Sequence, residues 1–271
     1  MLKYIAIYAV ISYTENMFNS VSFPEITYMH ILSEQVDKND FFNHQHETYE
    51  ILYVVKGGGT FLIEDSAYEF SGNTLFMIPP GKYHVLKIPP QSNYERIILN
   101  FSPQCVPPFI RHKKYILKNT PADIFSLFFK FDRYADSFSQ KPLYTLLTSL
   151  LSEALILLEH FENHTVLPEN NMPAIVKNAV NFINDHLDEP LSVEIIADSL
   201  YVSKTHLCHI FSKTMNIGIM RYVRMKKMFQ ARKYIAEGVS VQNAAEALGY
   251  DCYTTFLRNY KREFHVNPSE K

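Results

Sequence analysis

The C-terminal half of the chain repeats one helix-turn-helix pattern, and this repeat constrains the fold more than any other feature. Ala197 and Leu200 recur 48 residues later as Ala245 and Leu248. The following helix recurs with an offset of 49: Leu207, Phe211 and Asn216 correspond to Phe256, Tyr260 and His265. Each unit therefore supplies a small Ala where two helices cross, a turn, and a second helix that packs on the first. The second turn contains Gly249, which adopts positive φ at little cost.

A single helix is predicted between the two units. Residues 219–236 place apolar side chains at helical spacing, and 18 residues at ~1.5 Å rise per residue span ~27 Å. Successive major grooves of DNA are ~34 Å apart. The predicted helix would thus hold the two second helices close to the spacing of adjacent grooves.

The charge distribution is uneven. Residues 199–236 contain no Asp or Glu but eight Lys or Arg, in a chain of net charge -2. Residues 1–171 hold 13 Lys/Arg against 18 Asp/Glu, whereas residues 172–271 hold 13 against 10. An ordinary solvated surface is the alternative to a phosphate-binding one, but so long a run without an acid favours phosphate binding.

The N-terminal half predicts short strands over residues 49–55, 60–63, 74–78 and 96–101, separated by Gly- and Pro-containing turns. From about residue 121 the apolar spacing becomes helical. The clearest stripe consists of Leu143, Leu146, Leu147, Leu150, Leu151, Ala154, Leu155, Leu158 and Phe161. Such a helix either covers the β domain or forms a dimer contact. The predicted fold class is α+β multidomain, a jelly-roll β-barrel followed by an all-α domain with two helix-turn-helix units.

Three parts are predicted: a β-barrel over 1–120, a helical dimerisation or connector segment over 121–165, and a helical domain over 172–271. The polar stretch 163–173 is the expected boundary. The apolar run 4–11 is too short to span a bilayer and predicts a strand or packed tail, with a degenerate leader as the lesser alternative. Three widely spaced cysteines indicate a reducing compartment, so a cytoplasmic protein that does not engage the membrane is expected.

The helical domain carries a family pattern. Its residues are Ile183, His186, Leu191, Ser192, Val193, Ile196, Ala197, Ser203, Leu207, Phe211, Tyr222, Arg232, Ala244, Ala245, Gly249, Tyr250, Phe256, Arg258, Tyr260, Lys261, Arg262 and Pro268. Together they resemble the AraC/XylS family of bacterial transcription regulators. The resemblance implies specific binding of double-stranded DNA by both units, transcription control and contact with RNA polymerase. A homodimer is also expected. Two departures are Asn216 and His265, where the family usually has Gly, and a third is His209 in place of Arg.

The resemblance also implies roles for particular side chains. The base-reading residues would be Thr205, Cys208 and His209 in the first unit and Tyr253, Thr254 and Arg258 in the second. The phosphate-binding residues would be Ser203, Lys204, Lys213, Arg221, Arg224, Lys227 and Lys261. Because Arg258 can bond guanine with two hydrogen bonds, the second unit is expected to have the sharper base preference.

A second resemblance lies in the β domain. His44-x-His46-x-x-x-Glu50, followed by Gly57, and Pro79-x-Gly81-x-x-His84 resemble the two motifs of the cupin barrel. His44, His46 and Glu50 share parity on an extended strand, so their side chains can lie on one side. The expected effector-binding residues are His44, His46, Glu50, His84 and Tyr53. The same His and Glu residues are a chemically sensible, although less favoured, site for Fe, Mn or Zn.

Three functions are compatible with these features. The favoured one is a transcription regulator, not an enzyme, that responds to a small-molecule effector such as a sugar and requires no cofactor. The first alternative is a cupin-type metalloenzyme with an accessory DNA-binding domain. The second is a constitutive DNA-binding protein whose barrel only dimerises.

Overall fold

The computed structural model describes residues 15–36, 45–110, 114–161 and 172–269. Two compact units divide the chain: one lies within residues 3–170, and the other comprises residues 171–271 together with residues 64–66. The run 4–11, His44 and most of the expected linker lie outside the described residues. Helices of the segment 121–165 belong to the same unit as the strands.

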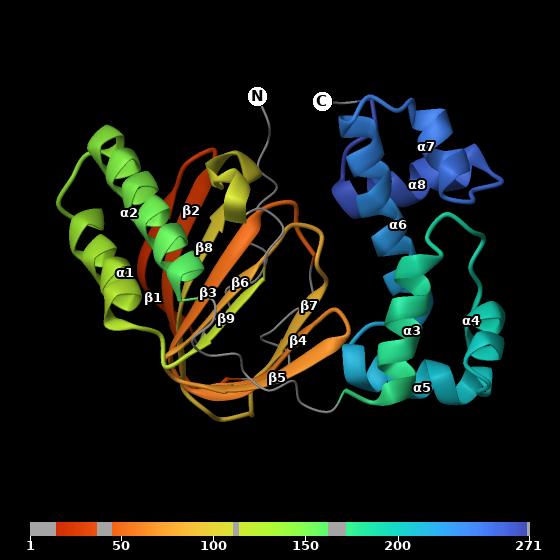
Figure 1. Ribbon diagram of the computed structural model, residues 1–271, viewed down its shortest axis with the longest axis horizontal. Coiled ribbons are helices and arrows are strands. Elements are labelled where there is room, and N and C mark those ends of the chain that lie inside the picture. The colour runs from red at the N-terminus through yellow and green to blue at the C-terminus, as the bar shows by residue number, and fades with distance from the viewer. Residues whose placement is uncertain (1–14, 37–44, 111–113, 162–171, 270–271) are drawn as a thin grey trace. The chain divides into compact units, whose positions relative to one another are not determined.

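The first unit is built on two antiparallel sheets (Figure 1). Its strands are β1 (Glu15–Ser22), β2 (Ile26–Ser33), β3 (Tyr49–Lys56), β4 (Gly58–Ile63), β5 (Ser66–Ser71), β6 (Thr74–Ile78), β7 (His84–Lys87), β8 (Tyr94–Phe101) and β9 (Tyr115–Lys118). The larger sheet has the order β1-β2-β8-β3-β6-β9, and the smaller has the order β5-β4-β7. Two 3-10 turns, Pro103–Cys105 and Pro108–Ile110, follow β8. The strands expected from the sequence are thus confirmed, including residues 74–78 without change.

The centre of the larger sheet is buried on both faces, because alternate residues of its inner strands pack in different cores. On β3, Ile51 and Tyr53 belong to the core shared with α1 (Ala122–Ala135) and α2 (Gln140–His160). Leu52 and Val54 belong to the other core, shared with residues of the smaller sheet. This division explains why β3 is buried over six consecutive residues.

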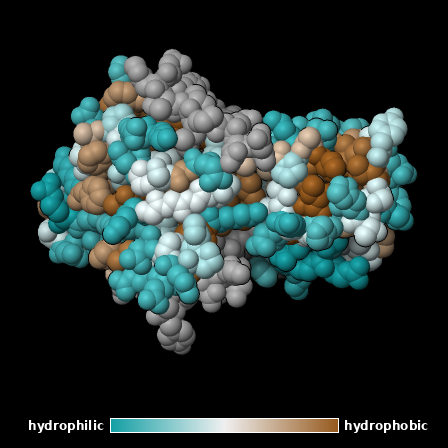
Figure 2. All heavy atoms as spheres, turned by 90° about the horizontal axis from the view of Figure 1, so that it is seen from below, coloured by the Kyte–Doolittle hydropathy of each residue, from teal (hydrophilic) through white to brown (hydrophobic). Residues whose placement is uncertain are grey.

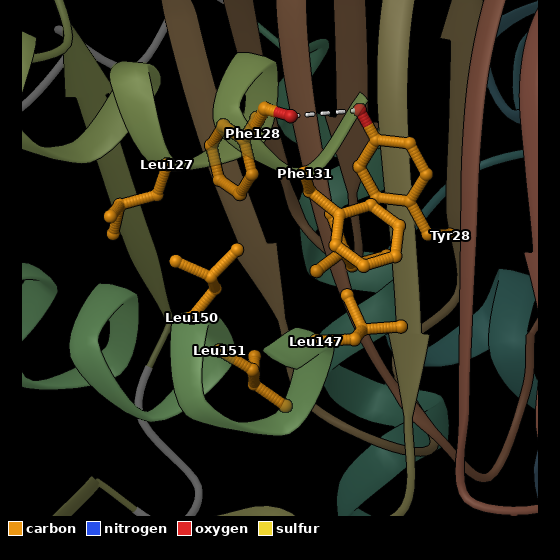
Figure 3. Close-up of a pocket in the computed structure, with 8 residues that line it drawn as sticks. Tyr28, Leu127, Phe128, Phe131, Leu147, Leu150 and Leu151 are labelled. Carbon is orange, nitrogen blue, oxygen red and sulfur yellow. Dashed lines mark hydrogen bonds between the residues drawn. The ribbon is translucent and has the colours of Figure 1, made fainter. Parts of the chain in front are cut away.

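The helices α1 and α2 cover the larger sheet. Figure 3 shows the small apolar pocket where Leu147 and Leu150 of α2 approach Phe131 of α1 and Tyr28 of β2. The Tyr28 hydroxyl donates a hydrogen bond of 3.1 Å to the carbonyl of Phe128. By length and hydropathy alone α2 could cross a membrane, but it contributes one side to this core. The covering role expected for the leucine stripe is confirmed, whereas the dimer role is untested.

The second unit is helical. It contains α3 (Ala174–Asp185), α4 (Val193–Ser199), α5 (Lys204–Met215), α6 (Ile219–Ala236), α7 (Val241–Ala247) and α8 (Tyr253–Phe264). The predicted connecting helix is confirmed with its bounds unchanged. Asn216 and His265, at the ends of α5 and α8, adopt the left-handed conformation with φ of 54° and 58°. The end of each helix therefore has the geometry that glycine usually supplies.

Candidate functional site

The first recognition helix, α5, presents a polar side to solvent. Ser203 precedes it, and its side chain accepts a hydrogen bond of 3.3 Å from the backbone N–H of His206, which caps the helix. Thr205 and His209 are exposed and Cys208 is half-buried. The opposite side of the helix buries Leu207, Phe211 and Met215. The three predicted base-reading residues thus lie away from the core.

The second recognition helix, α8, has the same arrangement. Tyr253 is 43% exposed, and Thr254 and Arg258 are exposed as well. Its other side packs Phe256, Tyr260 and Phe264 against α6 and α7 residues. The N-cap position is Cys252, whose side chain makes no capping hydrogen bond. Side-chain hydrogen bonds with Thr254 and Thr255 lower the pKa of the Cys252 thiol to about 7.

Several of the predicted phosphate-binding residues lie on the surface. Ser203, Lys213, Arg221 and Lys261 are exposed, and Figure 2 shows a largely hydrophilic surface on this unit around one apolar patch. Arg224 is half-buried, and its Nε is buried without a hydrogen-bond partner among the described residues. Burial and then the charge of Arg262 lower the pKa of the Arg224 guanidinium. Lys213, Arg221, Arg224 and Lys261 supply cationic groups on α5, α6 and α8.

Lys204 already has an acidic partner. Its Nζ lies 2.8 Å from a carboxylate oxygen of Glu194 on α4. The hydrogen bond from Lys204 lowers the pKa of Glu194 to about 2. Both side chains are 57% exposed, so water and salt screen the pair and a phosphate can compete for the lysine.

Lys227 is not a surface cation, and the sequence prediction is wrong on this point. The residue is 5% exposed, and its Nζ donates hydrogen bonds to the carbonyls of Glu189, at 2.6 Å, and Leu248, at 2.7 Å. Burial lowers the pKa of its ammonium group. The side chain joins a loop of the first helix-turn-helix unit to the turn of the second.

One exposed aromatic side chain is not predicted by the charge pattern. Tyr201, in the turn between α4 and α5, is 97% exposed and has a φ of 55°. Large aromatic residues rarely adopt this conformation or this exposure. A tyrosine inside a predicted helix-turn-helix turn is a signal that the sequence already contains.

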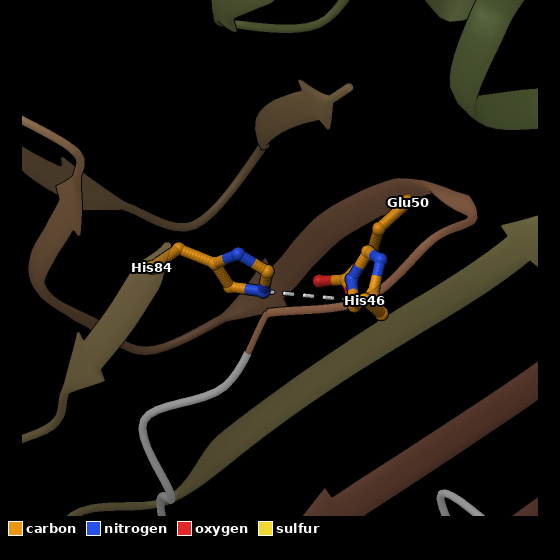
Figure 4. A group of neighbouring side chains, drawn as sticks. All are labelled: His46, Glu50 and His84. Carbon is orange, nitrogen blue, oxygen red and sulfur yellow. Dashed lines mark hydrogen bonds and ion pairs between the residues drawn. The ribbon is translucent and has the colours of Figure 1, made fainter. Parts of the chain in front are cut away.

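The β domain brings three of the predicted effector residues together (Figure 4). His46 precedes β3, Glu50 lies on β3, and His84 begins β7. The Nε2 of His46 is 3.0 Å from Oε2 of Glu50, and the Nε2 of His84 is 3.9 Å from the same oxygen. Potential ligand atoms of all three residues lie within 4.8 Å of one another. Glu50 and His84 are buried, so the group is largely screened from solvent.

Tyr53 does not belong to this group, and its assignment to the same site is wrong. Side chains alternate along a strand, and Tyr53 is three residues from Glu50. It therefore faces the helices, where its ring stacks on Phe128 and its hydroxyl donates to Asn73 at 3.1 Å. The period of two along the strand already separates Tyr53 from Glu50 in the sequence.

A residue that the sequence did not single out lies beside Glu50. Asn100 on β8 pairs directly with Glu50 across the two strands, so both side chains project from the same face. Asn100 is 4% exposed, and its Oδ1 has no hydrogen-bond partner among the described residues. Glu50 and Asn100 are 50 positions apart in the sequence, and only the pairing of β3 with β8 makes them neighbours.

Comparison with known proteins agrees with both parts. The sequence matches the AraC-like ligand binding domain over residues 28–140 and a helix-turn-helix domain over residues 196–271. An uncharacterised HTH-type transcriptional regulator of Bacillus subtilis, YfiF, is 24% identical over 266 residues, covering 89% of this chain and 82% of the relative. The lactose operon transcription activator of Staphylococcus xylosus is 22% identical, covering 84% and 85%. The multiple antibiotic resistance protein MarA of Escherichia coli is 30% identical over 104 residues, 38% of this chain and 82% of MarA.

A β domain of the ligand-binding type, joined to two helix-turn-helix units with exposed polar helices, defines a ligand-responsive, DNA-binding transcription regulator. The chain belongs to the AraC/XylS family of these regulators.

Proposed function

We propose that α5 and α8 enter successive major grooves of one DNA duplex, with α6 as the spacer between them. The exposed positions of Thr205, His209 and Arg258 support this proposal, because each side chain can reach a base edge from a groove-bound helix. Cys208, Tyr253 and Thr254 complete the proposed reading set. Lys213, Arg221 and Lys261 are the proposed phosphate contacts, with Ser203, Lys204 and Arg224 beside them.

The observation that carries the proposal is the polarity of the recognition helices. Each buries an aromatic and aliphatic side and leaves its predicted base-reading residues outside the core. The acid-free stretch of 38 residues runs through α5 and α6, and the outer sides of the two recognition helices carry threonine, histidine and arginine. Phosphate attraction and groove reading together account for this composition.

The effector is proposed to bind in the β domain at His46, Glu50 and His84, and His44 is kept in the proposed set. Control of DNA binding then requires that the ligand bind two conformations of the protein with different affinity. Action as a homodimer in the cytoplasm, with contact to RNA polymerase, is part of the same proposal. The similarity to the lactose operon activator of Staphylococcus xylosus supports control of an operon.

A salt titration tests the DNA interface. The probe is a duplex selected from a random pool by the full-length protein, and the variant carries Lys213→Glu with Arg221→Glu. Loss of two phosphate contacts should reduce the slope of log K against log salt by about 2 and weaken binding on every sequence. The matched control is Lys227→Met, which also removes a cation but should leave the slope unchanged.

An unchanged slope in the charge-reversed protein would contradict the proposed interface. An equal reduction of the slope by Lys227→Met would also contradict the proposed interface. Lys227 donates to two protein carbonyls, so its removal should not cost a phosphate contact.

A further inference from the structure

A short chain of hydrogen bonds joins α8 to the turn of the second helix-turn-helix unit. The Nη2 group of Arg262 donates to Oδ1 of Asn259 at 3.1 Å, and Nδ2 of Asn259 donates to the hydroxyl oxygen of Tyr250 at 3.3 Å. Because a guanidinium group only donates, the amide oxygen of Asn259 must lie toward Arg262 and its N–H toward Tyr250. The chain therefore ends in the Tyr250 O–H, for which the described residues offer no acceptor.

The Tyr250 hydroxyl is held in place by packing. The half-buried Tyr250 ring lies edge-on to Phe256, with ring centroids 5.4 Å apart, and the Lys227 Nζ is 5.6 Å from the centroid of the same ring. Asn259 is 7% exposed, so its amide is fixed as well. Burial raises the pKa of Tyr250, so the hydroxyl keeps its proton at neutral pH. A donor with a fixed position is thus available to a ligand.

Arg224 approaches the same hydroxyl from α6. Its guanidinium group makes no ion pair with a described residue, and its Nε is buried without a hydrogen-bond partner among them. After burial, the charge of Arg262 has the largest effect on the pKa of Arg224 and lowers it. The charges of Arg224 and Arg262 also act on Tyr250, where they oppose the rise in pKa caused by burial. The two guanidinium groups therefore lie near each other and near the Tyr250 hydroxyl.

A carboxylate, that of Glu263 on α8, lies in the same neighbourhood. Burial raises the pKa of Glu263, although the charges of Arg221, Arg262, His265 and Arg224 act in the opposite direction. In the described part of the chain, neither Glu263 nor any of the three arginines forms an ion pair. Positive charges that are held together cost free energy unless an anion lies among them. The protein itself thus leaves this group of arginines without a paired anion in its described residues.

The first helix-turn-helix unit folds without this arrangement. The residues that correspond to Tyr250 and Asn259, by the offsets of 48 and 49 between the units, are Val202 and Ile210. Both are half-buried, and the N–H of Val202 makes the same turn hydrogen bond as that of Tyr250. The chain of polar side chains is therefore not a requirement of the helix-turn-helix fold, and this favours a role in binding.

The chemistry of the group selects an oxyanion with several acceptor oxygens. Guanidinium groups and a protonated phenol can all donate hydrogen bonds, and arginine pairs with phosphate through two parallel bonds. We infer that Arg224, Tyr250 and Arg262 form a binding site for one phosphate group, beside Arg221. The inference rests on the proposed DNA interface and adds Tyr250 and Arg262 to it. The phosphate group belongs either to the DNA backbone or to a free phosphate compound.

The DNA source is tested by salt titration of the full-length protein on the selected duplex. Arg262→Gln removes one charge and should reduce the slope of log K against log salt by about 1. Tyr250→Phe keeps the ring but removes a neutral donor, so it should weaken binding about tenfold and leave the slope unchanged. The control Lys233→Gln removes an exposed cation of α6 and should change neither quantity.

The free source is tested without DNA, by melting curves in sodium phosphate and in sodium chloride of equal ionic strength. A rise in Tm that phosphate causes in the wild type, but not in Tyr250→Phe or Arg262→Gln, would support the site and assign it to a free phosphate compound. Weaker DNA binding by the variants without such a rise is the expected result and assigns the site to the DNA backbone.

Variants that match the wild type in both assays would overturn the inference. If they do so while Lys213→Glu with Arg221→Glu still reduces the salt slope, only this inference fails and the proposed DNA interface stands. If that double variant leaves the slope unchanged while phosphate still raises the Tm of the wild type alone, the DNA interface fails and the phosphate site remains.

Discussion

The turns of the two helix-turn-helix units have the same backbone and different surroundings. In the first, the N–H groups of Tyr201 and Val202 donate to the carbonyls of Asp198 and Ala197. In the second, the N–H groups of Gly249 and Tyr250 donate to the equivalent carbonyls, 48 residues later. Tyr201 has a φ of 55° and Gly249 a φ of 67°. Local hydrogen bonding thus defines both turns alike, although one contains tyrosine and the other glycine.

What differs is the space outside each turn. The Tyr201 side chain is 97% exposed, whereas a Cβ at Gly249 would lie 2.8 Å from the backbone of Glu189 and of Pro190. The Lys227 ammonium group donates to the carbonyls of Glu189 and Leu248, one on each side of the close approach at Gly249. The first turn is therefore free to meet another molecule, while the second turn joins the two halves of the helical unit.

The largest expected effect is a difference in the free energy of unfolding between variants of the two turns. Gly249→Ala should lower the free energy of unfolding of the helical unit by about 3 kcal/mol, through the positive φ and the contact with backbone. Tyr201→Gly should change it by less than about 1 kcal/mol, because no packing is lost. Thermal and urea unfolding of both variants measure the difference. Equal effects would show that the surroundings of the turns are not what distinguishes them.

A second contrast concerns base reading. Arg258→Ala should reduce discrimination at one base position by about 1–3 kcal/mol, because a bidentate contact with guanine is lost. His209→Ala, on the first recognition helix, should have the smaller effect, since one imidazole offers fewer groups to a base edge. Binding to a set of duplexes with single base changes measures both. A larger effect at His209 would reverse the proposed ranking of the two units.

The smallest expected effect concerns the helix caps. Ser203 caps α5 through its hydroxyl, and Cys252 occupies the equivalent position before α8 without such a bond. Ser203→Ala should destabilise the unit by about 1 kcal/mol. Cys252→Ser should stabilise the unit, and this gain in the free energy of unfolding should be smaller than the loss caused by Ser203→Ala. Melting temperatures of the two proteins check the signs, and a loss of stability in Cys252→Ser would contradict the comparison.

The sequence predicted much of this helical unit, because its signals are local. The bounds of α6 follow from apolar spacing after Gly218, and the positive φ of Gly249 follows from its place in the repeat. The left-handed ends at Asn216 and His265 follow from the same alignment. Each of these depends on a few neighbouring residues, so periodicity and turn chemistry are sufficient.

The error at Lys227 and the unpredicted neighbour Asn100 both involve partners far away in sequence. Lys227 donates hydrogen bonds to carbonyls that lie 21 and 38 positions away in the sequence, and the number of charged residues does not reveal these partners. Asn100 is placed next to Glu50 by strand pairing, so neither residue predicts the other. Tyr53 is a different case, because the alternation of β3 already separated it from Glu50.

By itself, the sequence determined two helix-turn-helix units on a common helix, a strand-rich domain before them, and a cationic stretch without acids. These features depend on residue spacing and composition, and both can be read directly from the amino-acid sequence. Only the tertiary structure decided which cations remain on the surface, which turn is free, and which polar groups surround Glu50. Burial and hydrogen bonding between distant segments determine those outcomes, and they arise when the chain is packed.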